Sequence, residues 1–173
     1  MVVLNEIKDG YPFEGRLGYL VGQMIDVRKL LLKEIEDLSQ DELDYTPDIN
    51  KFETIGTLIF HIADVENSWM FEAVDGQELD FEKWKYSFPL RQNLDPRQQT
   101  GKNLAYYNNI LKVTRENVLA RIEKFKDSDL KKEYSNRYGR FTLEWVLYHN
   151  TQHESHHIGQ INLLKRLKRK NKN

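Results

Sequence analysis

Residues 142–168 read TLEWVLYHNTQHESHHIGQINLLKRLK, and their apolar members recur at the three- and four-residue spacing of an amphipathic helix. His153 and His157 lie four residues apart in this stretch, which corresponds to about one helical turn and a rise of roughly 6 Å. Both share a helix face with Ile161 and Leu164. Because an apolar face packs toward the interior, the stretch predicts a core helix whose two imidazoles are buried or line the floor of a cleft.

Three further stretches show the same helical periodicity, at residues 15–38, 54–74 and 100–125. The sequence contains no alternating run of strand length and no internal repeat. Four helices of this length predict an all-α fold, a four-helix bundle that buries one stripe from each helix around a common core. The connection between the first two helices is short, so we expect them to be antiparallel neighbours.

The connections between the predicted helices differ in character. Ser39 and Glu42 form the pattern of a capping box after the first helix. Residues 77–99 contain two prolines and four aromatic side chains, which is unusual for a free linker. This segment therefore predicts a packed crossover between helices two and three. Residues 126–140 predict a polar connection to the last helix.

The composition is that of one soluble domain, which we assign to residues 1–173. Hydrophobic residues make up 39% and charged residues 31% of the 173 positions. The net charge of −1, from 26 basic and 27 acidic residues, gives no electrostatic reason to expect a nucleic acid or a membrane as partner. Residues 165–173 are basic and predict a solvated, frayed helix end.

The chain contains no cysteine. Disulfides, thiolate metal ligands and a cysteine nucleophile are therefore excluded, and any thiol chemistry needs a thiol from outside the protein. Charged residues interrupt the N-terminal region early, so it lacks an apolar run of signal-peptide length. We expect a cytoplasmic protein.

Four of the five histidines, His149, His153, His156 and His157, lie on the last predicted helix. Burying several neutral imidazoles without partners is costly, whereas one divalent metal ion satisfies them together. Spacing permits two ligand pairs, His149 with His153 or His153 with His157. The first and last of these three are about 12 Å apart along the helix axis, too far to share one ion easily. His156 points roughly 100° away from His157 and is the weakest candidate.

A third ligand must come from another helix, and His61 in the second helix is the histidine available there. On its own, His61 would be interpreted as a hydrogen-bonded core residue. Together with a pair from the last helix it predicts a three-histidine site with an open coordination position, which is the arrangement of catalytic metal sites. Asp64 lies one turn after His61 and can orient its ring or coordinate directly, with a solvated surface acid as the simpler alternative.

Residues 54–66, TIGTLIFHIADVE, and residues 153–160, HESHHIGQ, resemble the DinB family of YfiT-like four-helix-bundle metalloproteins. In that family a histidine of the second helix and a His-x-x-x-His pair ahead of a Gly-Gln ending bind a divalent metal. The resemblance thus implies His61, His153 and His157 as the ligands. It extends over residues 17–167. Many members have arginine before the Gly-Gln ending, where this chain has Ile158, so a substrate contact through that arginine is not expected here.

The resemblance also implies an activity. Family members include S-transferases and isomerases that use low-molecular-weight thiols, and proteins described as metal-dependent hydrolases; homodimers are common. Our hypothesis is a metalloenzyme that binds Zn²⁺, or alternatively Ni²⁺, Fe²⁺ or Mn²⁺, and transfers an external low-molecular-weight thiol to a small-molecule substrate. A metal-dependent hydrolase and a non-catalytic, stress-related helical scaffold are the alternatives. We expect a homodimer.

Overall fold

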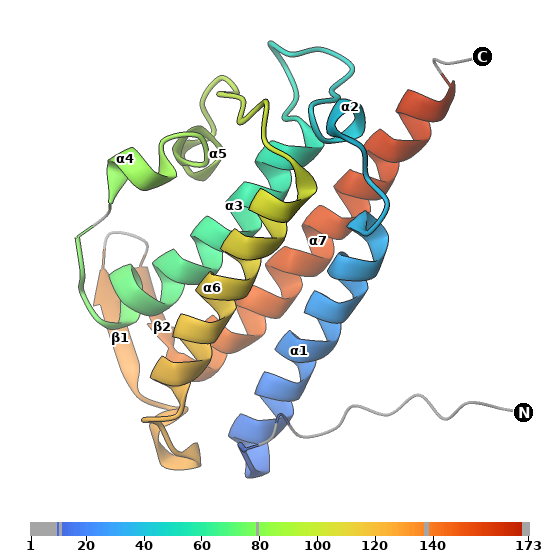
Figure 1. Ribbon diagram of the computed structural model, residues 1–173. Helices are drawn as coiled ribbons and strands as arrows, with labels where there is room; N and C mark the ends of the chain where they lie inside the picture. The colour runs from blue at the N-terminus through green and yellow to red at the C-terminus, as the bar shows by residue number, and fades with distance from the viewer. Residues whose placement is uncertain (1–9, 11, 79, 137–138, 171–173) are drawn as a thin grey trace, which may run out of the picture.

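A computed structural model describes residues 10, 12–78, 80–136 and 139–170. Figure 1 shows a bundle of four long helices, which confirms the predicted all-α class. The long helices are α1 (Gly15–Ile35), α3 (Ile55–Asn67), α6 (Leu104–Ile122) and α7 (Leu143–Lys170), and a π-helix, η1 (Ser68–Val74), extends α3. The shorter elements are α2 (Gln40–Leu43), α4 (Phe81–Trp84), α5 (Phe88–Gln92), the 3-10 helix η2 (Asp127–Asp129), β1 (Glu133–Asn136) and β2 (Gly139–Thr142).

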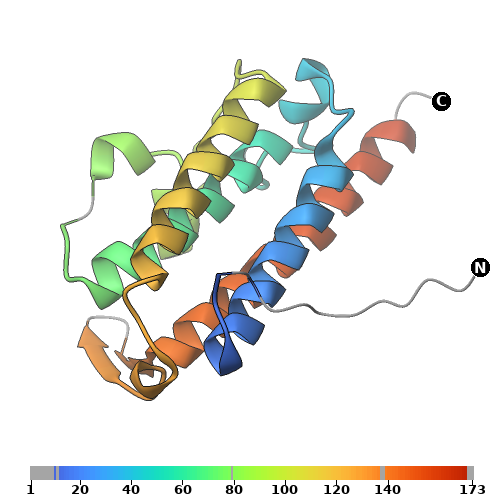
Figure 2. The ribbon, with the colours of Figure 1, turned by 60° about the horizontal axis from the view of Figure 1, so that its bottom comes forward.

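The four long helices do not simply alternate in direction. In Figure 1, α1 and α7 run upward, whereas α3 and α6 run downward. The helix α1 packs mainly on α7, and α3 packs on α6 and α7 (Figure 2). The expectation that the first two long helices are neighbours is therefore wrong, because α1 and α3 lie diagonally across the bundle. The crossover returns the chain to the top, and this places α6 parallel to α3 at its side.

The crossover between η1 and α6 is packed against the bundle, as its aromatic composition predicted. Trp84 of α4 is only 1% exposed, and its ring centroid lies 5.2 Å from that of Phe60 on α3. The end of the crossover is fixed to the start of α3, where Thr57 Oγ1 accepts the Gln99 N–H at 2.8 Å. These contacts place the crossover along the outer side of α3.

The start of α3 explains how two parallel helices approach closely. Thr54 is the N-cap of the helix, and its hydroxyl accepts the Thr57 N–H at 3.1 Å. At Gly56 a Cβ atom would collide with the Tyr107 hydroxyl of α6, so this position requires glycine. The same hydroxyl donates to the Gln99 carbonyl at 3.0 Å. These contacts thus fix the start of α3 against α6, about one turn before His61.

The core has two apolar halves with a polar layer between them. Each long helix contributes one charged side chain to this layer, and all four side chains are buried: Arg28, Glu66, Arg115 and Glu154. We call these residues the buried tetrad. Arg28 contacts Glu66 at 2.7 Å and Glu154 at 2.5 Å, and Arg115 contacts the same two carboxylates. The guanidinium groups also donate to the carbonyls of Leu111 and Met24.

A short β-hairpin, which the sequence analysis did not predict, lies between α6 and α7. Strands β1 and β2 pair antiparallel from Glu133 opposite Thr142 to Asn136 opposite Gly139. Each strand has only four residues, mostly polar, so a periodic pattern had no length over which to appear. The hairpin packs through Phe141, whose ring centroid lies 5.2 Å from that of Trp69 on η1.

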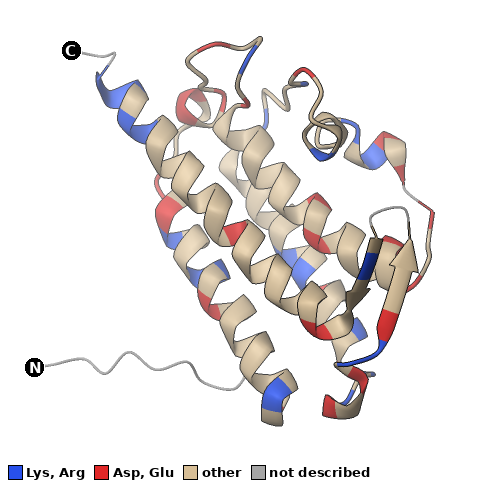
Figure 3. Ribbon diagram, turned by 180° about the vertical axis from the view of Figure 1, so that it is seen from behind, with Lys and Arg blue, Asp and Glu red and all other residues tan. Residues whose placement is uncertain are grey.

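The basic end of the chain continues α7 as far as Lys170, whereas the sequence predicted fraying from residue 165; residues 171–173 lie outside the described part. Figure 3 shows the blue basic positions at this end of the helix. Lys165 donates to the Glu34 carbonyl, and Lys168 lies 2.9 Å from the Asp41 carboxylate. Two of these lysines are therefore partnered with α1 and α2. Among the described helices, none is long and apolar enough to cross a membrane.

Candidate metal centre

Three histidine rings converge inside the bundle on the side of the crossover. His61 comes from α3, and His153 and His157 come from α7. His153 Nε2 lies 3.2 Å from His61 Nε2 and 3.0 Å from His157 Nε2. One nitrogen of each ring lies within 4.8 Å of the other two, a spacing at which three imidazoles can hold one metal ion. The structure thus brings together the three residues that the sequence motif indicated.

The second nitrogen of His61 is engaged by the crossover. Its Nδ1 lies 2.8 Å from Ser87 Oγ, and the Ser87 hydroxyl donates to Asp64 Oδ2 at 2.5 Å. When Asp64 is a carboxylate, the single hydroxyl proton points to it, so Ser87 accepts the hydrogen bond from His61 Nδ1–H. A neutral imidazole carries one N–H, so His61 Nε2 presents a lone pair toward the other two rings.

His157 is oriented in a similar way, by a residue of its own helix, α7. Its Nδ1 lies 2.5 Å from Gln160 Oε1, one turn further along the helix. The amide oxygen only accepts hydrogen bonds, so Nδ1 is the protonated nitrogen of this ring. His157 Nε2 therefore also presents a lone pair toward His153.

The three histidine nitrogens fit a cation, and they cannot satisfy one another by hydrogen bonds alone. His153 Nε2 faces two lone-pair nitrogens, from His61 and His157, but can carry one proton at most. At least one of the two short nitrogen–nitrogen contacts therefore joins two lone pairs. A divalent ion among the three Nε2 atoms would accept all three lone pairs, and neutral imidazoles are preferred ligands of Zn²⁺ and other transition metals.

Burial keeps the three rings neutral. It lowers the pKa of His61 and of His153 well below the usual histidine range, and neighbouring rings lower both further. The pKa of His157 falls to about 4, chiefly through burial, although Gln160 opposes the shift. At neutral pH the rings are therefore in the protonation state that metal binding requires.

Asp64 is fully buried, so the interpretation as a solvated surface acid is wrong. It reaches His61 through Ser87. Burial raises the pKa of Asp64 to about 7, while Arg91 and the Ser87 hydroxyl pull the pKa back down. Arg91 Nη1 lies 3.4 Å from Asp64, and Arg91 also contacts both oxygens of Glu72 on η1, at 3.2 and 2.8 Å.

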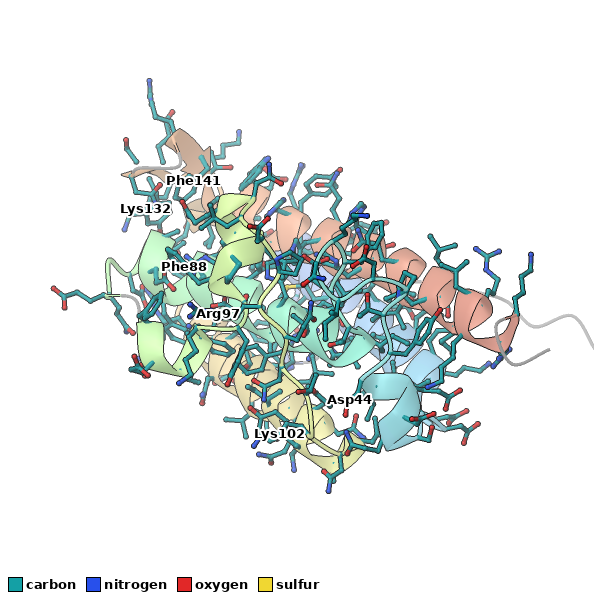
Figure 4. The ribbon with its side chains drawn as sticks, turned by 90° about the horizontal axis from the view of Figure 1, so that it is seen from above. Asp44, Phe88, Arg97, Lys102, Lys132 and Phe141 are labelled. Atoms are coloured by element: carbon teal, nitrogen blue, oxygen red, sulfur yellow. The ribbon has the colours of Figure 1, made fainter. Side chains whose placement is uncertain are left out.

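A cavity of about 270 Å³ lies beside two of the three rings. It is bounded by α3, η1, α5 and α7, and its lining residues are His61, Val65, Ser68, Trp69, Leu90, Arg91, His149 and His153. Figure 4 shows the crossover, with Phe88 labelled, beside α3 in a view from above. Two larger hollows, of about 480 and 470 Å³, lie elsewhere on the surface and contain none of the three rings. We therefore take the smaller cavity as the approach to the site.

The other two clustered histidines lie outside the three-ring group. His149 lines the cavity, with its ring stacked on Trp145 at a centroid distance of 4.5 Å. Its centroid is 5.9 Å from that of His153, further than those of His61 and His157. His156 is exposed, in keeping with its direction on the helix.

Sequence reasoning missed Ser87 and Arg91. Both lie in the crossover, and their contacts reach back to residues at least 19 positions earlier in the chain. A contact of that kind leaves no local spacing pattern. The available signal was that the crossover is too aromatic to be a free linker, which predicted that the segment packs but not what it touches.

Comparison with known proteins shows the family to which the chain belongs. No curated protein matches the chain. The family model of the DinB superfamily matches residues 23–161. This span contains all four long helices in large part, the crossover and the three converging histidines. The chain belongs to the DinB superfamily.

Proposed function

We propose that this protein is a metalloenzyme in which His61, His153 and His157 bind a divalent cation and the adjoining cavity binds a small-molecule substrate. The observation that carries the proposal is the convergence of three Nε2 atoms, two of them fixed as lone-pair donors, with nitrogen–nitrogen distances of 3.0 and 3.2 Å. Three imidazoles with a remaining open position are typical of catalytic zinc sites. Zn²⁺ is the preferred ion, with Ni²⁺, Fe²⁺ or Mn²⁺ as alternatives.

The cavity supports a catalytic role over a purely structural one. It gives a small molecule access to the side of His61 and His153. Trp69, Val65 and Leu90 offer it an apolar wall, and His149 offers a polar group. A structural zinc site, in contrast, is closed by four protein ligands.

The preferred reaction is transfer of a low-molecular-weight thiol to an electrophilic small molecule. When bound at such a site, a divalent cation lowers the pKa of a coordinated thiol or water, so that the nucleophile is available at neutral pH. A chain without cysteine cannot supply the thiol itself. A hydrolase that uses water at the same position is the alternative, and a non-catalytic scaffold is the second alternative.

Metal analysis tests the site. The purified protein, reconstituted with Zn²⁺ and dialysed, should retain close to one ion per chain. His61→Ala, His153→Ala and His157→Ala should each lose most of the metal, whereas His156→Ala, which changes an exposed ring of the same helix, should retain it. Retention by His157→Ala together with loss by His149→Ala would show that the wrong pair was chosen.

Visible spectroscopy tests the thiol. In the Co²⁺-substituted protein, a low-molecular-weight thiol should change the absorption through sulfur coordination, and His61→Ala should abolish the change. A spectrum that is indifferent to thiols, combined with turnover of an ester or amide in water, would favour the hydrolase. Indifference without any turnover would favour the scaffold. A homodimer and a cytoplasmic location remain predictions, which sedimentation and cell fractionation can test.

A further inference from the structure

The crossover contributes one side chain that touches a histidine of the metal centre. Ser87 is completely buried and lies at the start of α5, yet its hydroxyl does not cap that helix. Instead it accepts from His61 Nδ1 at 2.8 Å and donates to Asp64 at 2.5 Å. A buried serine that forgoes capping in favour of a histidine and a carboxylate indicates a role at the histidine.

We propose that Ser87, held by Asp64, is a positioning residue of the metal centre: it fixes His61 as the Nδ1–H tautomer, with the Nε2 lone pair directed at the metal position. This inference rests on the function proposed above. It adds that the crossover, and not only α3 and α7, completes the site. The ring of His61 is joined by one hydrogen bond to a residue 26 positions away in the sequence.

The direction of the hydrogen bonds is what gives the arrangement its effect. Asp64 accepts the only proton of the Ser87 hydroxyl, so the hydroxyl has only lone pairs left for His61. Without Asp64 as acceptor, the hydroxyl could donate to Nδ1 instead, and the ring would then carry its proton on Nε2. That tautomer places an N–H where a metal ligand needs a lone pair. Partners of this kind typically change metal affinity by 10- to 100-fold.

Three variants separate positioning from general packing. Ser87→Ala removes the hydroxyl, and Asp64→Asn keeps the shape of the acid but permits its amide to donate to Ser87. Ser68→Ala is the matched control, because Ser68 is also buried and lines the same cavity, while its hydroxyl forms no hydrogen bond with the three rings within the described residues. Each variant is examined metal-free by ¹⁵N NMR of labelled histidine, which distinguishes the tautomers, and for Zn²⁺ affinity by competition with a chromophoric chelator.

We expect the wild-type protein and Ser68→Ala to show His61 as the Nδ1–H tautomer and to bind Zn²⁺ equally. Ser87→Ala and Asp64→Asn should populate the Nε2–H tautomer and bind Zn²⁺ about 10- to 100-fold more weakly. Unchanged tautomer and affinity in both variants would overturn the inference while leaving the metal centre intact. If the wild-type protein binds no Zn²⁺, the proposed function fails and the tautomers still decide the role of Ser87. If Ser87→Ala does not fold, Asp64→Asn decides.

Discussion

The buried tetrad and the three-histidine group lie inside the same bundle, and they are built on opposite principles. In the buried tetrad, two arginines face two glutamates, and every contact joins a donor to an acceptor. In the three-histidine group, at least one of the two nitrogen–nitrogen contacts, at 3.0 and 3.2 Å, joins two lone pairs. The tetrad is enclosed between the two halves of the core, whereas the histidines border a cavity. The first cluster is complete without a ligand, and the second has a donor set that could hold a metal ion.

The difference separates a structural role from a binding role by chemistry rather than by burial, since all four side chains of the tetrad are buried and so are His61 and His157, with His153 half-buried. Burial on its own lowers the pKa of Arg28, but the carboxylates of Glu66 and Glu154 raise it by more. The paired charges therefore keep the tetrad ionised. The histidines have no such counter-charge in their group, so burial makes them neutral and leaves them able to bind a cation.

The largest effect is expected from removing one charge of the tetrad. Arg115→Met leaves Glu66 and Glu154 to share one arginine, so it should lower the free energy of unfolding by about 3–5 kcal/mol, measured by urea denaturation. The control is Arg121→Met on the same helix, whose ion pair with Asp75 is partly exposed and should be worth about 1 kcal/mol or less. Equal losses in the two variants would show that the tetrad has no special importance.

A pH effect on stability is expected from the histidine group. The pKa of His157 is about 4 in the folded protein, whereas an unperturbed histidine has a pKa of 6.5, so the unfolded state binds more protons between these limits. The stability contribution is complete above pH 6.5 and is lost as the pH falls toward 4, by roughly 3 kcal/mol. Asp64, with its pKa raised from 3.8 to about 7, acts in the opposite direction over the whole of this range.

Because Asp64 also contributes, the pH effect of His157 is tested as the difference in stability between two proteins. Metal-free wild-type protein is compared with His157→Gln by urea denaturation at several values of pH. The stability of the wild-type protein relative to the variant should fall between pH 7 and pH 4. A constant difference would mean that His157 is not the buried neutral ring described above.

Metal binding should stabilise the folded protein through the histidine group, and this stabilisation should not depend on the buried tetrad. Free Zn²⁺ at about 100 times its dissociation constant should add about 2.7 kcal/mol to the stability of the folded protein. The same increment is expected in Arg115→Met, because the tetrad does not contact the ion position, and none is expected in His153→Ala. Thermal denaturation with and without Zn²⁺ measures both. Loss of the increment in Arg115→Met would show that the two clusters are coupled.

The smallest effect is expected for an ion pair at the end of α7 that has one exposed partner. Lys168 reaches Asp41, whose side chain is 83% exposed. Lys168→Met retains the packing of the apolar stem and should cost less than about 1 kcal/mol. A loss as large as that of Arg115→Met would place this end of α7 among the main stabilising contacts.

The sequence predicted what depends on local periodicity. The stripes of the four long helices indicated the bundle. The spacing of the histidines left two pairs open, and the resemblance to the DinB family implied His153 and His157 together with His61. The tetrad was not predicted, although its signal was present: Arg28 lies between the core residues Met24 and Leu31, at a position where a charged side chain needs a buried partner. Identifying that partner requires knowing which helices face each other.

Other features depended on contacts that no pattern encodes. Ser87 meets His61 only because the crossover folds back along α3. The hairpin consists of strands of four residues, too short for an alternating pattern to stand out. The helices α1 and α3 were predicted to be neighbours, but they lie diagonally across the bundle. The prediction failed because the length of a loop limits the distance between helix ends but does not decide which other helix packs between them.

The buried tetrad also bears on how the chain folds. Each of the four long helices carries one of its charges, so a bundle that lacks any one helix would bury an unpaired charge, at a cost of several kcal/mol. Partly assembled bundles are thereby raised in free energy relative to both the unfolded and the native states. The expected consequence is an all-or-none transition in which no three-helix intermediate accumulates, even though the apolar core is divided into two halves.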